Sequence, residues 1–173
     1  LLSFFLGIGG WYFCSRMDYH RWQGWATKLF GITLLMMLLV LVPGISLNVN
    51  GAARWVKFGP VNFQPVEFFK LGTIVFTAAW ITKNKSKLSD FKQGLLPILA
   101  IVAIVAFLTV IIQKDMGSSM VIILSIFAMY FVAGAGGMNL LIGFSVMAGG
   151  VGMLAVIAPY RLARVLTFLG KSD

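Results

Sequence analysis

The chain has 173 residues, of which 60% are hydrophobic and only 11% charged, and its mean hydropathy is +0.94. A soluble domain of this size could not bury so much apolar surface. The apolar runs are continuous, without the alternation of a membrane β-barrel. Composition therefore predicts an all-α integral membrane protein, because helices satisfy their own backbone groups in lipid.

The net charge of +9 and the scarcity of Cys and His restrict the function further. With one cysteine (Cys14) and one histidine (His20), we expect no internal disulfide and no metal site. No basic stripe with interleaved aromatics lies outside the apolar runs, so we expect no nucleic-acid partner. Two interpretations of the charge stay open: basic loops that face anionic membrane lipids, or a site for an anionic lipid-linked substrate.

Apolar runs separated by polar or glycine-rich breaks predict a polytopic helix bundle with about five full spans after a partial first helix. In chain order, the expected helices cover residues 1–14 (partial), 29–42, 65–82, 95–113, 118–133 and 140–158. The expected connectors are a polar aromatic stretch at 15–28, a loop at 48–65, a basic connector at 83–94, a short break at 114–117 and a glycine-rich turn at 134–139. An amphipathic piece is expected at 161–169. Because the chain begins inside one apolar run and stops just after another, we interpret it as a single transmembrane domain, residues 1–173, from a larger protein.

Alternating connectors define two sides of the membrane. Side one holds 15–28 and the lysine-rich 83–94, which favours side one as cytoplasmic. Side two holds 48–65, 114–117 and 161–169. Its cationic charge nearly equals that of side one, which is more than an outer face normally carries. We interpret this charge as retained to meet an anion.

Polar side chains continue from side two into the third helix. Gln64, Glu67 and Lys70 are spaced by three residues, which places them on one helical face. Thr73 and Thr77 continue that face inward. Two interpretations remain open: a structural ion pair with Glu67 at the positive end of the helix dipole, or the polar lining of a cavity that opens to side two.

Further cationic and acidic groups are predicted on the same side. Arg54 and Lys57 suit phosphate oxygens, although interfacial snorkelling is the interpretation that the two residues alone favour. Asp115 is expected to cap the fifth helix, or to share the cavity. Arg161 and Arg164, three residues apart, fit an interfacial amphipathic helix or the same anionic site.

The ordered motifs GAARW (51–55), QPVE-x-x-K (64–70), QKDMGSS (113–119), AGAGG (133–137) and PYRLAR (159–164) resemble the SEDS family of bacterial membrane proteins, which includes FtsW, RodA and SpoVE. The resemblance covers nearly the whole chain, and the PYRLARVLTF ending resembles the division branch more than the rod-shape branch. Two positions depart from the family pattern. Val66 replaces a small residue, and Lys114 stands where proline is usual.

The resemblance implies a ten-helix fold, of which this chain supplies helices two to seven, in the bacterial cytoplasmic membrane with side two outward. Family members are peptidoglycan glycosyltransferases that polymerise lipid II, and they act with a class B penicillin-binding protein and other division or elongation proteins. The family's catalytic aspartate is expected beyond Asp173, so the chain alone is expected to be inactive. We expect no cofactor in it. The predicted substrate site comprises Arg54, Lys57, Gln64, Glu67, Lys70, Asp115, Arg161 and Arg164. Two other functions stay open: transport of the lipid-linked precursor, and a non-enzymatic scaffold for the penicillin-binding protein.

Overall fold

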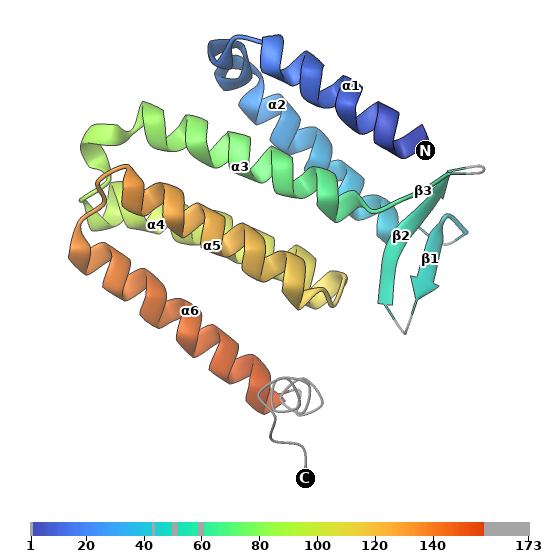
Figure 1. The fold of residues 1–173 in the computed structure, drawn as a ribbon. Coiled ribbons are helices and arrows are strands. Elements are labelled where there is room, and N and C mark those ends of the chain that lie inside the picture. Colours follow the sequence, from blue (N-terminus) through green and yellow to red (C-terminus); the bar gives the residue numbers. More distant parts are fainter. Residues whose placement is uncertain (1, 43, 50–51, 59–60, 158–173) are drawn as a thin grey trace.

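The computed structural model describes residues 2–42, 44–49, 52–58 and 61–157, and it is a helix bundle with one small sheet (Figure 1). The helices are α1 (Leu2–Arg16), α2 (Tyr19–Leu38, followed by a 3-10 turn at Leu39–Leu41), α3 (Pro65–Lys83), α4 (Leu96–Ala106), α5 (Met116–Val132) and α6 (Gly137–Ile157). Turns of π-helix at Phe91–Leu95 and Phe107–Ile112 extend α4 at both ends. The strands are β1 (Ser46–Val49), β2 (Ala52–Phe58) and β3 (Val61–Phe63).

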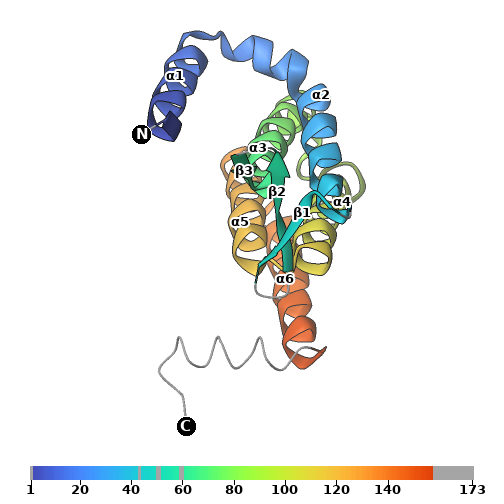
Figure 2. The ribbon, with the colours of Figure 1, turned by 90° about the vertical axis from the view of Figure 1, so that its right-hand side faces the viewer.

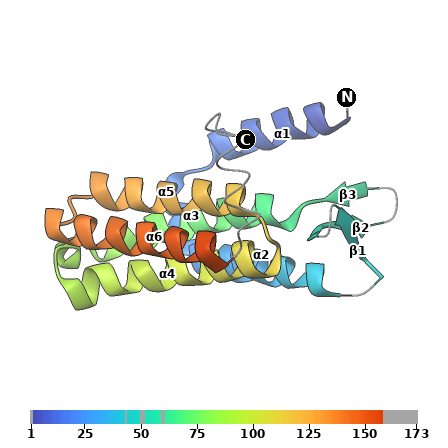
Figure 3. The same cartoon turned by 90° about the horizontal axis from the view of Figure 1, so that it is seen from below.

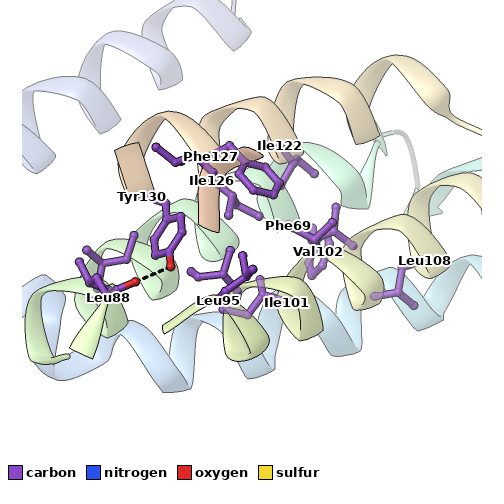
Figure 4. Packing of buried hydrophobic residues seen from close by; sticks show 14 of the residues in the cluster. Phe69, Leu88, Leu95, Ile101, Val102, Leu108, Ile122, Ile126, Phe127 and Tyr130 are labelled. Carbon is purple, nitrogen blue, oxygen red and sulfur yellow. Dashed lines mark hydrogen bonds between the residues drawn. The ribbon is translucent and has the colours of Figure 1, made fainter. Parts of the chain in front are cut away.

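Helix α3 is central to the bundle, since it packs against both α2 and α5, while α4 packs against α5 (Figures 1 and 3). Buried side chains from these helices form one apolar core, which includes Phe69, Leu95, Ile122 and Phe127 (Figure 4). Helix α1 stands apart from the other helices (Figure 2). Many large apolar side chains on the outside of the bundle are exposed, as expected for surfaces that face lipid.

Two helical segments, Tyr19–Leu41 and Phe91–Ile112, are long and apolar enough to cross a membrane. The expected helices at 65–82, 95–113 and 118–133 are confirmed to within a few residues. The last described helix begins three residues before the expected position 140, at Gly137. The amphipathic piece predicted at 161–169 lies outside the described residues.

The second helix begins well before the expected residue 29, because Asp18 caps it. The Asp18 carboxylate accepts a hydrogen bond from the backbone N–H of His20 at 2.9 Å, which satisfies one of the free donors of the first turn. This backbone hydrogen bond is the main cause of the lowered pKa of Asp18. The polar stretch that was expected as a connector therefore forms the first turns of α2.

The stretch expected as a loop at 48–65 instead forms a three-stranded antiparallel sheet in the order β1-β2-β3. Ser46 pairs with Val56, and Lys57 pairs with Asn62. Side chains alternate along β2: Val56 is fully buried, whereas Trp55 and Lys57 on either side are exposed. Because successive side chains point to opposite faces of a strand, one face of β2 is buried at Val56 and the other face carries the exposed Lys57.

Two glycines allow close approach of neighbouring helices. A methyl group on Gly72 of α3 would collide with the Thr33 side chain of α2, and one on Gly143 of α6 would collide with the Phe127 ring of α5. Thr33 and Phe127 are both buried. Small residues at such crossings let membrane helices pack backbone to backbone.

Candidate functional site

The sheet, the start of α3 and the junction between α4 and α5 all lie at one end of the bundle (Figure 1). The connector between α3 and α4 and the turn between α5 and α6 lie at the opposite end. The structure therefore agrees with the assignment of 48–65 and 114–117 to side two, and of 83–94 to side one.

Arg54 on β2 binds the junction between α4 and α5. Its Nε donates to the carbonyl oxygen of Gln113 at 3.1 Å, and its Nη2 donates to the carbonyl oxygen of Lys114. These carbonyls follow the last helical turn at Phe107–Ile112, where a cation is favoured by the negative end of the helix dipole. Arg54 therefore fixes the sheet to the helix junction, a contact that links residues about 60 positions apart in the sequence.

Lys114 adopts a left-handed backbone conformation with φ of 53°. L-residues with a side chain rarely adopt this conformation because Cβ crowds the carbonyl oxygen. It turns the chain between α4 and α5 so that the Lys114 carbonyl meets Arg54.

Glu67 and Lys70 form an ion pair in the first turns of α3. Lys70 Nζ lies 2.8 Å from Glu67 Oε1, and the side chains are 23% and 55% exposed for Lys70 and Glu67, respectively. Glu67 also lies in the first turn of α3, where an anion is stabilised by the helix dipole. The expected common face of these residues is confirmed, and the lysine is the more shielded partner.

The remaining predicted residues differ in their exposure and in their hydrogen bonds. Lys57 is exposed on β2. Gln64 occupies the N-cap position of α3, but its side chain makes no capping hydrogen bond. Asp115 caps α5, since its carboxylate accepts from the backbone N–H of Ser118 at 3.1 Å and from the Ser118 hydroxyl at 2.9 Å. The capping role weighed for Asp115 is thus confirmed. Arg161 and Arg164 lie outside the described residues.

Buried polar groups accompany the site within the bundle. Gln113 is fully buried; its Nε2 lies 3.2 Å from the sulfur of Met37, and its Oε1 has no partner among the described residues. Thr73 and Thr77 continue the polar face of α3 inward, fully buried and with hydroxyl oxygens that also lack a described partner. The sequence analysis included Gln113 in a family motif but gave it no role in the site, although a glutamine at the end of an apolar run was a visible signal.

These features define an α-helical membrane protein that spans the bilayer several times and gathers cationic and acidic side chains at one end of its bundle. The family model described as "Cell cycle protein", for FtsW, RodA and SpoVE, matches residues 1–173. The chain belongs to this family.

Curated relatives of named function are similar over most of this chain. Stage V sporulation protein E of Bacillus subtilis is 35% identical over 168 residues, which are 95% of this chain and 45% of that protein. A probable peptidoglycan glycosyltransferase FtsW of Allochromatium vinosum is 34% identical over 150 residues, 87% of this chain and 37% of that protein. The chain thus spans less than half the length of these relatives.

Solved structures share the fold. A chain from a peptidoglycan synthase complex, studied for the coordination of polymerization and crosslinking, matches 99% of this chain with 29% identity and a TM-score of 0.75. The rod-shape-determining protein RodA of Thermus thermophilus matches 76% of this chain with 30% identity and a TM-score of 0.62. This chain covers 50% and 42% of those two chains, respectively.

Proposed function

We propose that the protein carrying this chain is a peptidoglycan glycosyltransferase that polymerises lipid II in the bacterial cytoplasmic membrane, together with a class B penicillin-binding protein. The observation that carries the proposal is family membership over the whole chain, combined with relatives named as probable peptidoglycan glycosyltransferases. The similarity to a peptidoglycan synthase complex supports the crosslinking partner.

In this proposal the side-two residues hold the anionic end of the lipid substrate. Lys70 on α3 is three-quarters shielded from solvent, and Lys57 is exposed on β2. Ammonium groups stabilise the charge of a departing pyrophosphate. Arg54, whose Nε and Nη2 already bind carbonyls, positions the sheet and offers its remaining N–H groups to the substrate.

The other predicted residues have supporting roles in this proposal. Gln64 and Glu67 shape the site, and Asp115 holds the start of α5. Arg161 or Arg164 completes the cationic set.

The ion pair gives Lys70 a defined position before substrate arrives. Glu67 holds the ammonium group at 2.8 Å, which lowers the entropy lost when a phosphate is bound. Glycosyl transfer also needs a general base to accept the proton of the attacking sugar hydroxyl, and we place that group outside this chain, as the resemblance implies.

The test is polymerisation of purified lipid II by the full-length protein with its penicillin-binding partner. Lys70→Ala and Lys57→Ala are expected to lose roughly tenfold or more in rate, since each removes an electrostatic contact of the transition state. Arg21→Ala is the matched control, because Arg21 is an exposed cation on α2. Folded Lys70→Ala and Lys57→Ala proteins with wild-type polymerisation and binding would contradict the proposed site.

The same assay separates the other two functions. A scaffold would give no polymer from the complete protein even with its partner present. A transporter would move the lipid without polymerising it and would need a polar path across the bilayer. On α3, the described residues between Lys70 and Lys83 include no ionisable side chain, which favours the polymerase.

A further inference from the structure

We propose that the connector between α3 and α4 is an anchored binding surface for the headgroups of anionic phospholipids. This basic connector, residues 83–95, lies at side one, opposite the candidate polymerase site (Figure 1). The proposal is independent of the polymerase function.

The basic connector carries a local excess of positive charge. Lys83, Lys85, Lys87 and Lys92 are all exposed. Its single acid, Asp90, accepts the backbone N–H of Gln93 at 2.6 Å and thereby caps the following helical turn. Among the described residues, none of these four lysines has a carboxylate within ion-pair distance. Their charge is therefore available to an anion outside the protein.

Buried hydrogen bonds hold the middle of the basic connector to the bundle. Leu88 is 1% exposed, and its carbonyl oxygen accepts from Tyr130 Oη of α5 at 2.6 Å (Figure 4). Asn139 Nδ2 of α6 lies 3.2 Å from the same oxygen and 3.0 Å from the carbonyl oxygen of Ser89. Because donor and acceptor groups in this contact are buried, its loss would leave unpaired polar groups and is costly.

The connector is also folded tightly on itself. A methyl group on Gly94 would collide with the backbone carbonyls of Leu88 and Lys87. Asn84 closes the end of α3, since its side-chain amide donates to the carbonyl oxygen of Trp80 at 2.9 Å. The lysines on either side of Leu88 therefore extend from a fixed backbone, which reduces the entropy cost of binding a partner.

The position of the basic connector favours a lipid over a soluble acidic partner. The membrane-length helix Phe91–Ile112 begins within it, so the lysines lie where that helix enters the bilayer. Phe91 and Leu96 are 48% and 53% exposed, which provides apolar contact beside the cations. Ammonium groups above exposed apolar side chains match a phosphodiester headgroup above its acyl chains.

The test compares binding of phosphatidylglycerol and phosphatidylcholine to the purified full-length protein by native mass spectrometry. The Lys85→Gln/Lys87→Gln variant is expected to bind phosphatidylglycerol about tenfold more weakly, from the loss of two cations near the membrane surface. Phosphatidylcholine binding is expected to be unchanged. Arg16→Gln/Arg21→Gln is the matched control, because it also removes two positive charges, one at the end of α1 and one at the start of α2. This control variant is expected to retain phosphatidylglycerol binding.

A third variant tests the anchor. Asn139→Ala removes the side-chain contacts to Leu88 and Ser89 but keeps every lysine, and a several-fold loss of phosphatidylglycerol affinity is expected. Unchanged affinity in this variant would reject the anchored surface. Equal losses in the two double variants would reject a localised site. A wild-type protein that does not prefer phosphatidylglycerol would also overturn the proposal and would favour an acidic protein segment as the occupant.

Discussion

The guanidinium of Arg54 donates to the carbonyl of Lys114, 60 residues later in the chain, and joins the small sheet to the junction of two helices. A second hydrogen bond, to the carbonyl of Gln113, fixes the direction of the guanidinium. The contact gives Arg54 a structural role in addition to the substrate-binding role proposed for it.

Arg54→Gln is therefore expected to lower the free energy of unfolding by roughly 1–3 kcal/mol, because it removes a charge-assisted contact to two carbonyls. Arg54→Lys is expected to recover little of the lost free energy of unfolding, since an ammonium group lacks the planar fork of donors of a guanidinium. Thermal unfolding in detergent measures the effect. Lys57→Gln, an exposed neighbour on the same strand, is the control and should change stability by less than about 0.5 kcal/mol. Equal stability of the Arg54 and Lys57 variants would contradict the structural role.

Lys114 provides a test of the helix junction through its backbone. Its φ of 53° is disfavoured for residues with a side chain. Lys114→Gly is expected to raise the free energy of unfolding by up to about 1 kcal/mol, after allowance for the flexibility of glycine in the unfolded chain. Lys114→Pro is expected to lower it by more than about 1 kcal/mol, because proline fixes φ near −65°. A proline variant as stable as the parent would show that the junction tolerates another conformation.

The role of the ion pair between Glu67 and Lys70 can be tested by exchanging the two charged residues. In Glu67→Lys/Lys70→Glu the two charges remain three residues apart on the same face, so stability is expected to stay within about 1 kcal/mol of the parent. Polymerisation of lipid II is expected to be lost, because the shielded position would then carry a negative charge. Circular dichroism melting and the polymerisation assay read the two effects separately. Retained activity in the swapped protein would exclude direct contact between Lys70 and the anionic substrate.

The approach of α2 and α3 predicts opposite effects for two glycines. Gly72→Ala would force a methyl group against the buried Thr33 side chain and is expected to cost about 1–3 kcal/mol. Gly31→Ala in α2 meets no atom within 4 Å and is expected to stabilise the helix by about 0.5–1 kcal/mol. Melting temperatures of the two variants check this difference. A stabilised Gly72→Ala protein would mean that the helices are farther apart than described.

Buried threonines give a matched pair for hydrogen bonding. The Thr109 hydroxyl donates to the Val105 carbonyl at 2.7 Å, whereas the equally buried Thr73 hydroxyl has no described partner. Thr109→Val is expected to cost about 0.5–1.5 kcal/mol, and Thr73→Val is expected to stabilise the protein by about 1 kcal/mol. Unfolding of both variants in the same detergent measures the contrast. A loss of stability in Thr73→Val would indicate that its hydroxyl is satisfied by a bound water or another polar group.

Sequence reasoning predicted the helices well because apolar runs in a membrane protein have few alternatives. The start of α3 near Pro65 and the cap at Asp115 followed from local rules and are confirmed. The sheet was not predicted, because β1 and β3 have only four and three residues and the buried Val56 of β2 gives little periodic signal by itself. The beginning of α2 was placed too late, because polar first turns were treated as a connector although Asp18 could cap them.

At the candidate site, spacing alone predicted the common face of Glu67 and Lys70. It could not predict that Arg54 binds the carbonyls of Gln113 and Lys114, because that contact depends on the left-handed backbone at Lys114. A hydrogen bond between a side chain and backbone carbonyls about 60 residues away leaves no trace in local sequence patterns. The roles of the site residues with substrate remain predictions.

The bond between Arg54 and Lys114 also limits how this chain can be recombined. A chimera that exchanges residues 52–58 for those of a relative, but keeps 113–115, would combine a sheet and a helix junction that did not evolve together. Proline, which the resemblance implies at position 114, cannot adopt the positive φ that Lys114 has in this structure. We therefore expect chimeras that exchange residues 52–58 and 113–115 together to keep this contact, and chimeras that exchange either segment alone to disturb it.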